Sequence, residues 1–535
     1  MTGKRWSKCA ATALLAVLLS VLAAFAFPAT GLASTLHRGN SGEPGSIDPQ
    51  KMNGDWEHII VEDLFLGLTT DDARGNAIPG VAKSWTISED KTRYTFTLRD
   101  NVRWSDGKPV TAEDVVLGFR RGVDPKTASP NASLLYVIKN AAAVNAGKLP
   151  VDQLAVTAPD SKTVVIDLVA PTPYFLDFLS HPVTYPVPSH VIQSYGDDWV
   201  KAEHIVSDGA YKLVEWVPQA HIRAVKNPAF YDAKSVKIDE VYYYPTEDRS
   251  AALRRFRAGE LDINNDVPID QIAWLKSNMP DELRLAPFLA TYYYVFNMSK
   301  PPFDDKRVRV ALSMLVDRET ITDRILRTGD MPAYGVVPPG VANYTGGVKA
   351  SFALLDDAER IKRARALLAD AGYGPDHPLT VTIRYNTSEN HKKVSTAIAA
   401  MWKRAGVQTK LLNADVAVHY AALREGDFEV ARAGWVADYN DPQNFLILLS
   451  DKTWTINYSR YENPIFDRYM NEAAKTTDVK ARAELLRKGE IAAIEDAPIL
   501  PIYFYVSKNL VSTRVRGWVD NPENVHPTRF LSLQP

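Results

Sequence analysis

The sequence predicts an α/β protein with more than one domain. Its 535 residues are enough for two or three domains of ordinary size. Before about residue 288, short apolar segments with alternating polarity, such as residues 207–213 and 222–225, are typical of paired strands. After residue 288, helical segments alternate with strands. We therefore expect a β-rich first part followed by a separate α/β lobe.

The first part contains strand and helix signals in a clear order. Residues 94–99 alternate with a period of two, which predicts a half-buried strand. Thr111 and Asp114 have the spacing of a capping box, so a helix is expected to begin there. Residues 164–168 read as another strand, and the proline-rich segment 171–188 suits a crossing between domains. A helix over residues 249–258 is expected to end at Gly259.

The second part is more regular. A helix rich in alanine and leucine is expected to end at Gly372, and residues 379–385 alternate like a strand. A second helix, residues 394–405, is expected to end at Gly406 and to lead into an apolar strand at residues 407–412. We find no internal repeat and no low-complexity segment in the sequence.

Composition and charge exclude some function classes. The chain is 46% hydrophobic and 24% charged, as in an ordinary globular protein, and its net charge is −2. Residues 1–33 contain three basic residues and no acidic one, so the rest of the chain contains 59 basic and 64 acidic residues. Such a surface repels phosphate, so we expect no nucleic-acid partner.

The N-terminus is typical of a cleaved signal peptide. Three basic residues precede an apolar run at residues 10–27, and Gly31-Leu32-Ala33 provides small residues for cleavage after Ala33. An uncleaved membrane anchor is the alternative, because the run is close to spanning length. The single cysteine, Cys9, precedes the run and so cannot be the lipid-bearing residue of a lipoprotein. We expect a mature protein that begins at residue 34, lies free in a bacterial periplasm and has no disulfide.

One stretch of the second part, residues 431–442, has the features of a binding pocket. Gly434 makes the backbone approachable, and Trp435 offers an indole face. Arg432 supplies a basic group and Asp438 an acidic one, so together they could hold an extended zwitterion such as a peptide. The structural alternative is the end of a strand with a core tryptophan and a capping aspartate.

The sequence lacks the motifs of common enzymes. It contains no Gly-x-Ser-x-Gly, no His-Glu-x-x-His, no phosphate-binding Gly-x-x-x-x-Gly-Lys and, once residues 1–33 are removed, no cysteine nucleophile. No two of its ten histidines are three or four residues apart, which disfavours a local metal motif. We expect no enzymatic activity, no cofactor and no metal site.

Several motifs together resemble a known family. They are Ser46-Ile47-Asp48-Pro49, Pro79-Gly80-Val81-Ala82 and the run from Trp104-Ser105-Asp106-Gly107 to Asp114. With them the chain resembles the family 5 extracellular solute-binding proteins, which are the peptide, oligopeptide and nickel receptors of bacterial ABC importers. The oligopeptide-binding branch is the most similar, through further runs at residues 291–294, 301–309, 385–388 and 391–393 and through the stretch 431–442. The resemblance spans almost all of the chain after residue 33.

The resemblance implies a two-lobed periplasmic-binding-protein fold of class II type, cluster C, with an extra inserted subdomain and a hinge between the lobes. We place lobe I at residues 34–63, 189–289 and 507–535, and the inserted subdomain at residues 64–188. Lobe II is placed at residues 290–506. Two chain crossings between the lobes would form the hinge, and hinge closure around ligands is known for periplasmic binding proteins.

The resemblance also implies a ligand and roles for individual residues. Short peptides would be captured as extended chains and delivered to a membrane-embedded ABC permease by a receptor that is expected to be monomeric. Asp438 would bind the ligand's α-ammonium group, while Arg432 and His391 would neutralise its C-terminal carboxylate. The remaining predicted contacts are backbone bonding near Gly434, Asn264 and Asn265, and side-chain pockets walled by Tyr293 and Trp435. From the residues alone, His391 reads as part of a solvated polar turn and residues 292–294 as a strand with alternating core aromatics.

Two departures from the family pattern leave the ligand open. Leu326 stands where some oligopeptide-binding relatives have a basic residue, and Asn53 stands where an acidic group can occur and is kept as a candidate ligand-binding residue. A specialised receptor for a murein tripeptide, or for a non-peptide ligand such as a nickel chelate or haem, is the alternative function. A periplasmic hydrolase with dispersed catalytic groups is the third possibility. An ammonium anchor at Asp438 favours the peptide receptor over a receptor for a metal complex.

Overall fold

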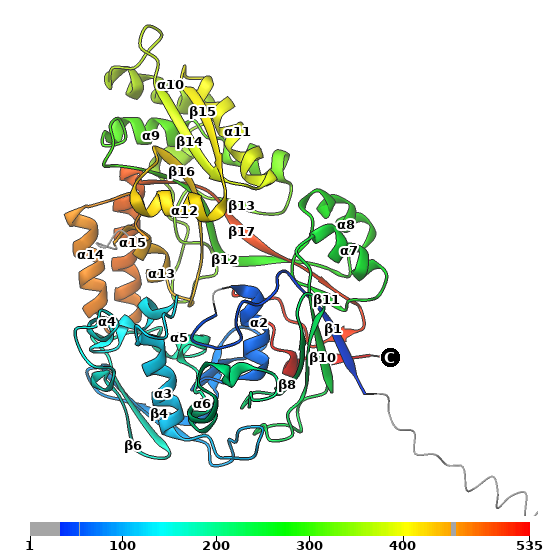
Figure 1. The fold of residues 1–535 in the computed structure, drawn as a ribbon. Coiled ribbons are helices and arrows are strands. Elements are labelled where there is room, and N and C mark those ends of the chain that lie inside the picture. The colour runs from blue at the N-terminus through cyan, green and yellow to red at the C-terminus, as the bar shows by residue number, and fades with distance from the viewer. Residues whose placement is uncertain (1–32, 53, 451–455, 535) are drawn as a thin grey trace, which may run out of the picture.

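The computed structural model describes residues 33–52, 54–450 and 456–534. The chain forms two lobes, an upper and a lower one in Figure 1, joined by strands β12 (Leu283–Phe296) and β17 (Ile499–Val511). The expected two-lobed α/β fold is confirmed. Residues 1–32, which contain nearly all of the predicted signal peptide, lie outside the described residues, as does Asn53.

One eleven-stranded sheet runs through both lobes. Its order is β15 (Gln408–Ala414), β14 (Thr380–Asn386), β16 (Val430–Val436), β12, β17, β11 (Ile263–Asn264), β1 (Thr35–Asn40), β10 (Glu240–Pro245), β9 (His221–Lys226) and β8 (Tyr211–Val217), while β13 (Met331–Pro332) pairs with β17 off this path. Strands of the upper lobe are therefore hydrogen-bonded, through β12 and β17, to strands of the lower lobe.

The pairing of β12 with β17 is interrupted where the chain passes between the lobes. On one side Leu283 to Pro287 pair with Leu510 to Val506, and on the other Thr291 to Val295 pair with Phe504 to Ile499. Between these segments, residues 288–290 of β12 lie opposite the single residue Tyr505 of β17. Extra residues on one strand locally disrupt the ladder and bend it. We call residues 288–290 and Tyr505 the crossing bulge.

The lower lobe has a second, smaller sheet. Its order is β4 (Ala82–Ile87), β5 (Arg93–Leu98), β7 (Thr163–Asp167) and β6 (Val156–Asp160), and helix α3 (Ala112–Val123) packs beside it. The predicted helix start is confirmed, since the Asp114 N–H donates to Thr111 Oγ1 at 3.4 Å. Two-stranded ladders are formed by β2 (Thr69–Asp71) with β3 (Ala77–Pro79) and by β18 (Val515–Arg516) with β19 (Ser532–Leu533).

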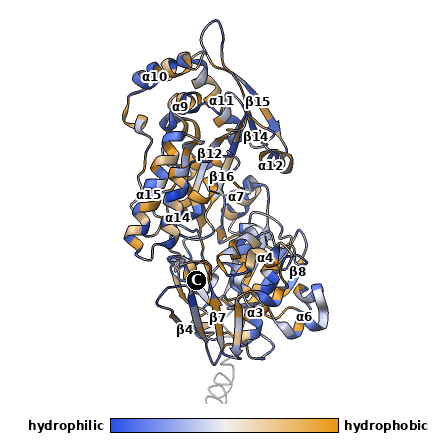
Figure 2. Cartoon of the chain, turned by 90° about the vertical axis from the view of Figure 1, so that its left-hand side faces the viewer, coloured by the Kyte–Doolittle hydropathy of each residue, from blue (hydrophilic) through white to orange (hydrophobic). Residues whose placement is uncertain are grey.

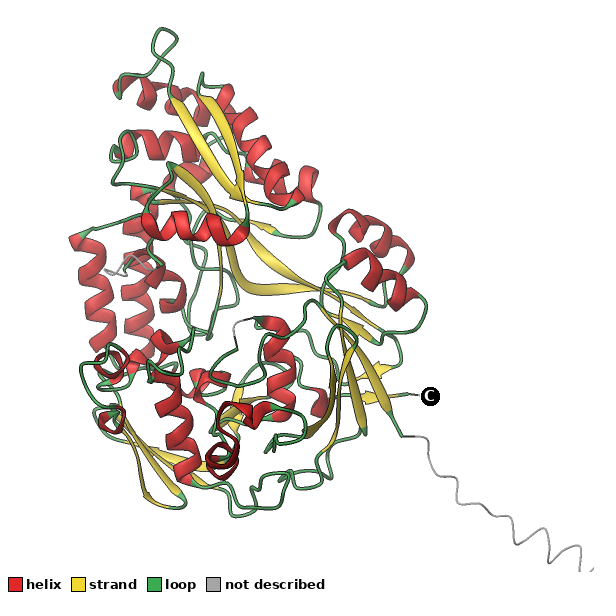
Figure 3. Cartoon of the chain, viewed as in Figure 1, coloured by secondary structure: helices red, strands yellow, loops and turns green. Residues whose placement is uncertain are grey.

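Helices cover the sheets on the outside of both lobes, as Figure 3 shows. Those of the first part of the chain are α2 (Asp55–Leu64), α4 (Ala141–Asn145), α5 (Phe175–Phe178), α6 (Ser189–Tyr195), α7 (Arg249–Arg257) and α8 (Ile272–Asn278). Those of the second part are α9 (Lys306–Met314), α10 (Asp357–Asp370), α11 (Glu389–Lys403), α12 (Val416–Glu425), α13 (Gln443–Leu446), α14 (Pro464–Lys475) and α15 (Val479–Asp496). The glycines at 259, 372 and 406 have φ of +76°, +93° and +84° just after α7, α10 and α11, as expected for helix ends.

Each lobe has its own hydrophobic core. Most members of one cluster lie between Leu36 and Ile263, and the other extends from Leu289 to Tyr503. A third, smaller cluster lies under α7 and α8. In the side view of Figure 2 the outer helices, such as α10 and α14, carry both hydrophilic and hydrophobic residues, as expected for helices with one buried face. None of the described helices is long and apolar enough to cross a membrane.

The first residues of the stretch 431–442 belong to a strand. Strand β16 continues from Val430 through Gly434 and Trp435 to Val436. Pairing with β12 explains this: Ala290 to Phe296 match Val436 to Val430 residue by residue. The strand ends at Val436, so Asp438 lies just beyond it.

Candidate functional site between the lobes

Strand β16 has one paired edge and one partly open edge. Along one edge it pairs with β12 over its whole length, but β14 pairs with the other edge only at Val430 and Ala431. Among the described residues, no strand pairs with the second edge from Arg432 to Val436. An open edge offers N–H and C=O groups to an extended chain.

Arg432 is a buried cation held by neutral groups. Its Nη1 donates to Asn386 Oδ1 at 3.3 Å and to the Tyr420 hydroxyl at 3.2 Å, and its Nη2 donates to the Tyr505 hydroxyl at 3.0 Å. The guanidinium carbon lies 4.7 Å from the centre of the Tyr292 ring. Only 8% of Arg432 is exposed, and its Nε has no hydrogen-bond partner within the described chain.

The charge of Arg432 has no counter-ion in the part of the chain that the structure describes. All three of its acceptors are neutral, and a guanidinium stays protonated in proteins. An uncompensated buried charge costs free energy, and a carboxylate bound to it would recover part of that cost. The backbone carbonyl of Arg432 is already used, because His419 Nε2 donates to it at 2.8 Å.

His391, at the start of α11, lies in the same cluster as Arg432. Its Nδ1 is 3.1 Å from the Tyr292 hydroxyl. Burial, with the nearby positive charge of Arg432 as the next cause, lowers the pKa of His391 to about 2. The ring is therefore neutral without a ligand and can give a carboxylate a hydrogen bond but no charge. The solvated polar turn that the residues alone suggested is not what the structure has, since His391 is partly buried.

Asp438 lies beyond the opposite end of the open edge. Its Oδ2 accepts a weak hydrogen bond from Asn444 Nδ2 at 3.4 Å, and within the described residues it has no cationic partner. Desolvation raises the pKa of Asp438 to about 6, and the negative charge of Asp55, at the start of α2 in the lower lobe, adds to the rise. Two carboxylates from different lobes thus act on the same space, which favours a positively charged group between them.

Trp435 and Gly434 lie between the two charges. The Trp435 Nε1 donates to Asn444 Oδ1 at 2.7 Å, so one asparagine fixes both the indole and the Asp438 carboxylate. A Cβ atom added to Gly434 would lie 3.0 Å from Arg432 Nη2 and 3.4 Å from the Tyr505 hydroxyl. A side chain at this position would therefore crowd the ends of Arg432 and Tyr505, which would have to shift by a few tenths of an ångström.

Among the described residues, the other predicted site residues make no hydrogen bond to the two charged side chains. Asn264 is 5% exposed, and its Nδ2 donates to the Asp266 carbonyl, whereas Asn265 Oδ1 is buried without a partner among the described residues. Tyr293 is only 2% exposed, and its side chain leaves β12 on the face opposite to Tyr292. The strand with core aromatics that the residues suggested is therefore present, while a role for Tyr293 in ligand contact stays a prediction.

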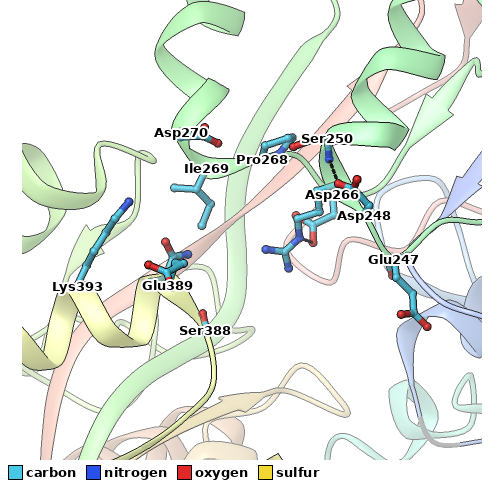
Figure 4. Close-up of a pocket in the computed structure, with 13 residues that line it drawn as sticks. Glu247, Asp248, Ser250, Asp266, Pro268, Ile269, Asp270, Ser388, Glu389 and Lys393 are labelled. Atoms are coloured by element: carbon cyan, nitrogen blue, oxygen red, sulfur yellow. Dashed lines mark hydrogen bonds and ion pairs between the residues drawn. The ribbon is translucent and has the colours of Figure 1, made fainter. Parts of the chain in front are cut away.

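A polar cavity lies beside the first turn of α11, the turn that carries His391. Its volume is about 620 Å³, and it is lined by residues around the start of α7, by the segment that leads into α8, and by the first turn of α11. Figure 4 shows Lys393 and Glu389 on one side of this cavity and Asp248 and Asp266 on the other. Both lobes thus contribute walls.

Sequence reasoning missed the residues that hold the predicted ones in place. Tyr420 and Tyr505 bind Arg432 from α12 and β17, and Asn444 binds Asp438 and Trp435 from α13. They are far from the stretch 431–442 in sequence or carry no motif of their own, so no local signal marks them. Among the described residues, no group of three or more His, Cys, Asp or Glu side chains is arranged to hold a metal ion.

Two lobes joined by paired strands, with unpaired opposite charges at the two ends of an open strand edge between them, define a two-lobed binding protein. The model of the bacterial extracellular solute-binding proteins, family 5, matches residues 76–457. The chain belongs to this family, which confirms the resemblance seen in the sequence.

Individual members of the family are similar over nearly the whole chain. The periplasmic oligopeptide-binding protein OppA of Escherichia coli K12 is 41% identical over 492 residues, which cover 90% of this chain and 89% of that protein. The periplasmic murein peptide-binding protein MppA of the same strain is 40% identical, with coverages of 92% and 91%. The crystal structure of Haemophilus influenzae OppA in complex with RPPGFSPFR matches with a TM-score of 0.81 and 35% identity, covering 94% of this chain and 99% of that one.

Proposed function

We propose that this protein is a periplasmic receptor that captures short peptides as extended chains between its lobes and delivers them to an ABC-type permease in the membrane. One observation carries the proposal. Arg432 and Asp438, of opposite charge and without ion-pair partners among the described residues, flank an open strand edge. A free peptide has the complementary arrangement, with an ammonium group at one end and a carboxylate at the other.

Each part of the site then has a role. Asp438 binds the α-ammonium group, and Arg432 binds the C-terminal carboxylate with a hydrogen bond from His391. Backbone groups near Gly434, Asn264 and Asn265 pair with the peptide backbone, and Trp435 and Tyr293 border the side-chain pockets. Because these contacts are to the backbone and the termini, many side-chain sequences are accepted.

The length of the strand bounds the length of the ligand. Five residues lie between Arg432 and Asp438, so their Cα atoms are at most about 20 Å apart. An extended peptide spans roughly 3.3–3.6 Å per residue, and the arginine side chain bridges part of the remainder. This estimate favours peptides of roughly three to five residues.

The wider biology follows from the same proposal. The receptor is a monomer that undergoes no covalent chemistry with its ligand, and it is exported by a signal peptide that is cleaved after Ala33. Lobe I comprises residues 34–63, 189–289 and 507–535, with residues 64–188 as its inserted subdomain, and lobe II comprises residues 290–506. The similarity to the oligopeptide-binding proteins OppA supports the peptide-receptor function.

Isothermal calorimetry with three forms of one peptide tests the function. Tri-alanine, N-acetyl-tri-alanine and tri-alanine amide differ only in the charge at one end. We expect tri-alanine to bind, and each blocked form to bind at least about tenfold more weakly because one buried charge stays unpaired. Equal affinity for all three forms would contradict both assigned ends of the site.

Two variants assign each end separately. Asp438→Asn is expected to abolish the preference for tri-alanine over N-acetyl-tri-alanine. Arg432→Gln is expected to abolish the preference for tri-alanine over tri-alanine amide. Asp100→Asn, at an exposed carboxylate of the lower lobe, serves as the matched control and keeps both preferences. Recovery of intact peptide after long incubation is expected, whereas cleavage that a cleft variant abolishes would make the protein a hydrolase.

A further inference from the structure

Tyr505 lies where the two lobes meet. It is the one residue of β17 at the crossing bulge, opposite residues 288–290 of β12, and it has no strand partner in the described ladder. The segments on either side of it pair in different lobes, and the upper one contains a second, one-residue shift at Ile502. A change in the angle between the lobes is therefore absorbed most easily at this point, because the fewest ladder hydrogen bonds resist it there.

The side chain of Tyr505 leaves the crossing bulge toward the ligand site. Its hydroxyl accepts from Arg432 Nη2 at 3.0 Å, and it lies near Gly434, where a Cβ atom would be only 3.4 Å from the hydroxyl. The tyrosine thus joins the flexible point of the crossing to the residue assigned to the ligand carboxylate.

The other strand of the bulge is joined to the other end of the site. Leu289 accepts from the Ala437 N–H at 2.8 Å, and Ala437 directly precedes Asp438. Leu289 also donates its own N–H to the carbonyl of Pro522 at 2.8 Å, in the C-terminal segment. One strand of the bulge is therefore bonded to Arg432 itself, and the other to Ala437, the neighbour of Asp438.

We propose that Tyr505 is a positioning residue that couples the binding of a ligand carboxylate at Arg432 to closure of the lobes. This inference rests on the proposed function and adds to it how occupancy of the site is passed to the crossing strands. A bound carboxylate fixes the guanidinium, the guanidinium fixes the Tyr505 hydroxyl, and the bulge is held in the closed arrangement. A ligand closes the lobes only to the extent that it binds the closed form more tightly than the open one.

The variant Tyr505→Phe keeps the ring and removes the hydroxyl. Tyr503→Phe is the matched control, since Tyr503 lies in the same strand and its hydroxyl makes no hydrogen bond to Arg432. Circular dichroism and thermal unfolding establish that both variants are folded. Two readouts follow: the affinity ratio of tri-alanine to tri-alanine amide by calorimetry, and the decrease in radius of gyration at saturating tri-alanine by small-angle X-ray scattering.

For Tyr505→Phe we expect the acid-to-amide preference to fall from at least about tenfold to below about threefold, and the ligand-induced compaction to fall below half of the wild-type value. Tyr503→Phe is expected to match the wild type in both. Wild-type behaviour of Tyr505→Phe, or an equal loss of affinity for acid and amide with full compaction, would overturn the coupling. Wild-type protein that binds neither ligand would instead overturn the proposed function.

Discussion

Tyr174 of the lower lobe and Tyr439 of the upper lobe stack face to face, with ring centres 4.1 Å apart and planes inclined by 6°. Tyr439 directly follows Asp438 in the chain, and the next residue, Asn440, donates its N–H to Asp177 Oδ2 at 2.8 Å. The loop that carries the proposed ammonium anchor therefore also makes direct contacts between the lobes, away from the crossing strands.

The first prediction concerns this stacked pair. Tyr174→Ala removes this stacking contact between the lobes, and an aromatic pair contributes about 0.5–1.5 kcal/mol beyond its buried area. We expect peptide affinity to fall about twofold to tenfold by calorimetry, without loss of the fold. Tyr195→Ala, at a surface tyrosine that stacks on His204 of the lower lobe, is the control and leaves affinity unchanged. An unaltered affinity in Tyr174→Ala would show that the pair does not favour the bound form.

The second prediction concerns pH. The pKa of Asp438 is raised to about 6 in the free protein, and a bound ammonium group would lower it. Below about pH 6 the free protein therefore holds a proton that must leave on binding, so affinity is expected to fall by up to about tenfold per pH unit there. Between about pH 7 and the pKa of the peptide ammonium group, near 8, the affinity is expected to be independent of pH. Asp438→Asn should remove the slope; a slope that persists in this variant would assign the titration to another group.

The third prediction concerns the space at Gly434. A methyl group there would lie 3.0 Å from Arg432 Nη2 and would press on the contact between Arg432 and Tyr505. We expect Gly434→Ala to weaken tri-alanine binding by about tenfold or more and tri-alanine amide binding much less. Gly374→Ala is the control, because a Cβ atom there meets no heavy atom within 4 Å. Equal weakening of both ligands by Gly434→Ala would mean that the glycine matters to the peptide backbone instead.

The fourth prediction concerns stability. Burial, with the neighbouring carboxylate of Asp177 as the next cause, raises the pKa of Asp71 to about 7. The folded state therefore binds a proton more tightly than the unfolded state, in which an aspartate titrates near 3.9. The stability that the protonated Asp71 contributes is lost as pH rises from about 4 to about 7, and it stays lost at higher pH. Asp71→Asn is expected to raise the melting temperature at about pH 8 and to change it little at about pH 5. The same melting temperature for both proteins at pH 8 would contradict this account.

Local signals in the sequence were sufficient for many elements. Thr111 and Asp114 mark a helix start because the cap is made within four residues, and Gly372 marks a helix end because its positive φ is a local requirement. The charges at Arg432 and Asp438 were likewise visible in one short stretch. One basic and one acidic residue a short distance apart complement the two charged ends of a peptide, so the peptide could be inferred from residue type and spacing.

Other features depend on contacts between distant residues. The continuation of β16 to Val436 follows from its pairing with β12, which is about 140 residues earlier in the chain. The neutral acceptors around Arg432 come from three separate elements, so nothing in the stretch 431–442 indicates that its charge is left unpaired. The low pKa of His391 also arises from burial and from Arg432, which a reading of its own neighbours Lys392 and Lys393 could not reveal.

The most direct test of the central claim is native mass spectrometry of the protein purified from the periplasm, followed by denaturation and sequencing of the released small molecules. A mixture of short peptides with free termini, of roughly three to five residues, is the expected result. A ligand without a free ammonium group and a free carboxylate, or protein that is empty and binds no added tri-alanine, would contradict the account.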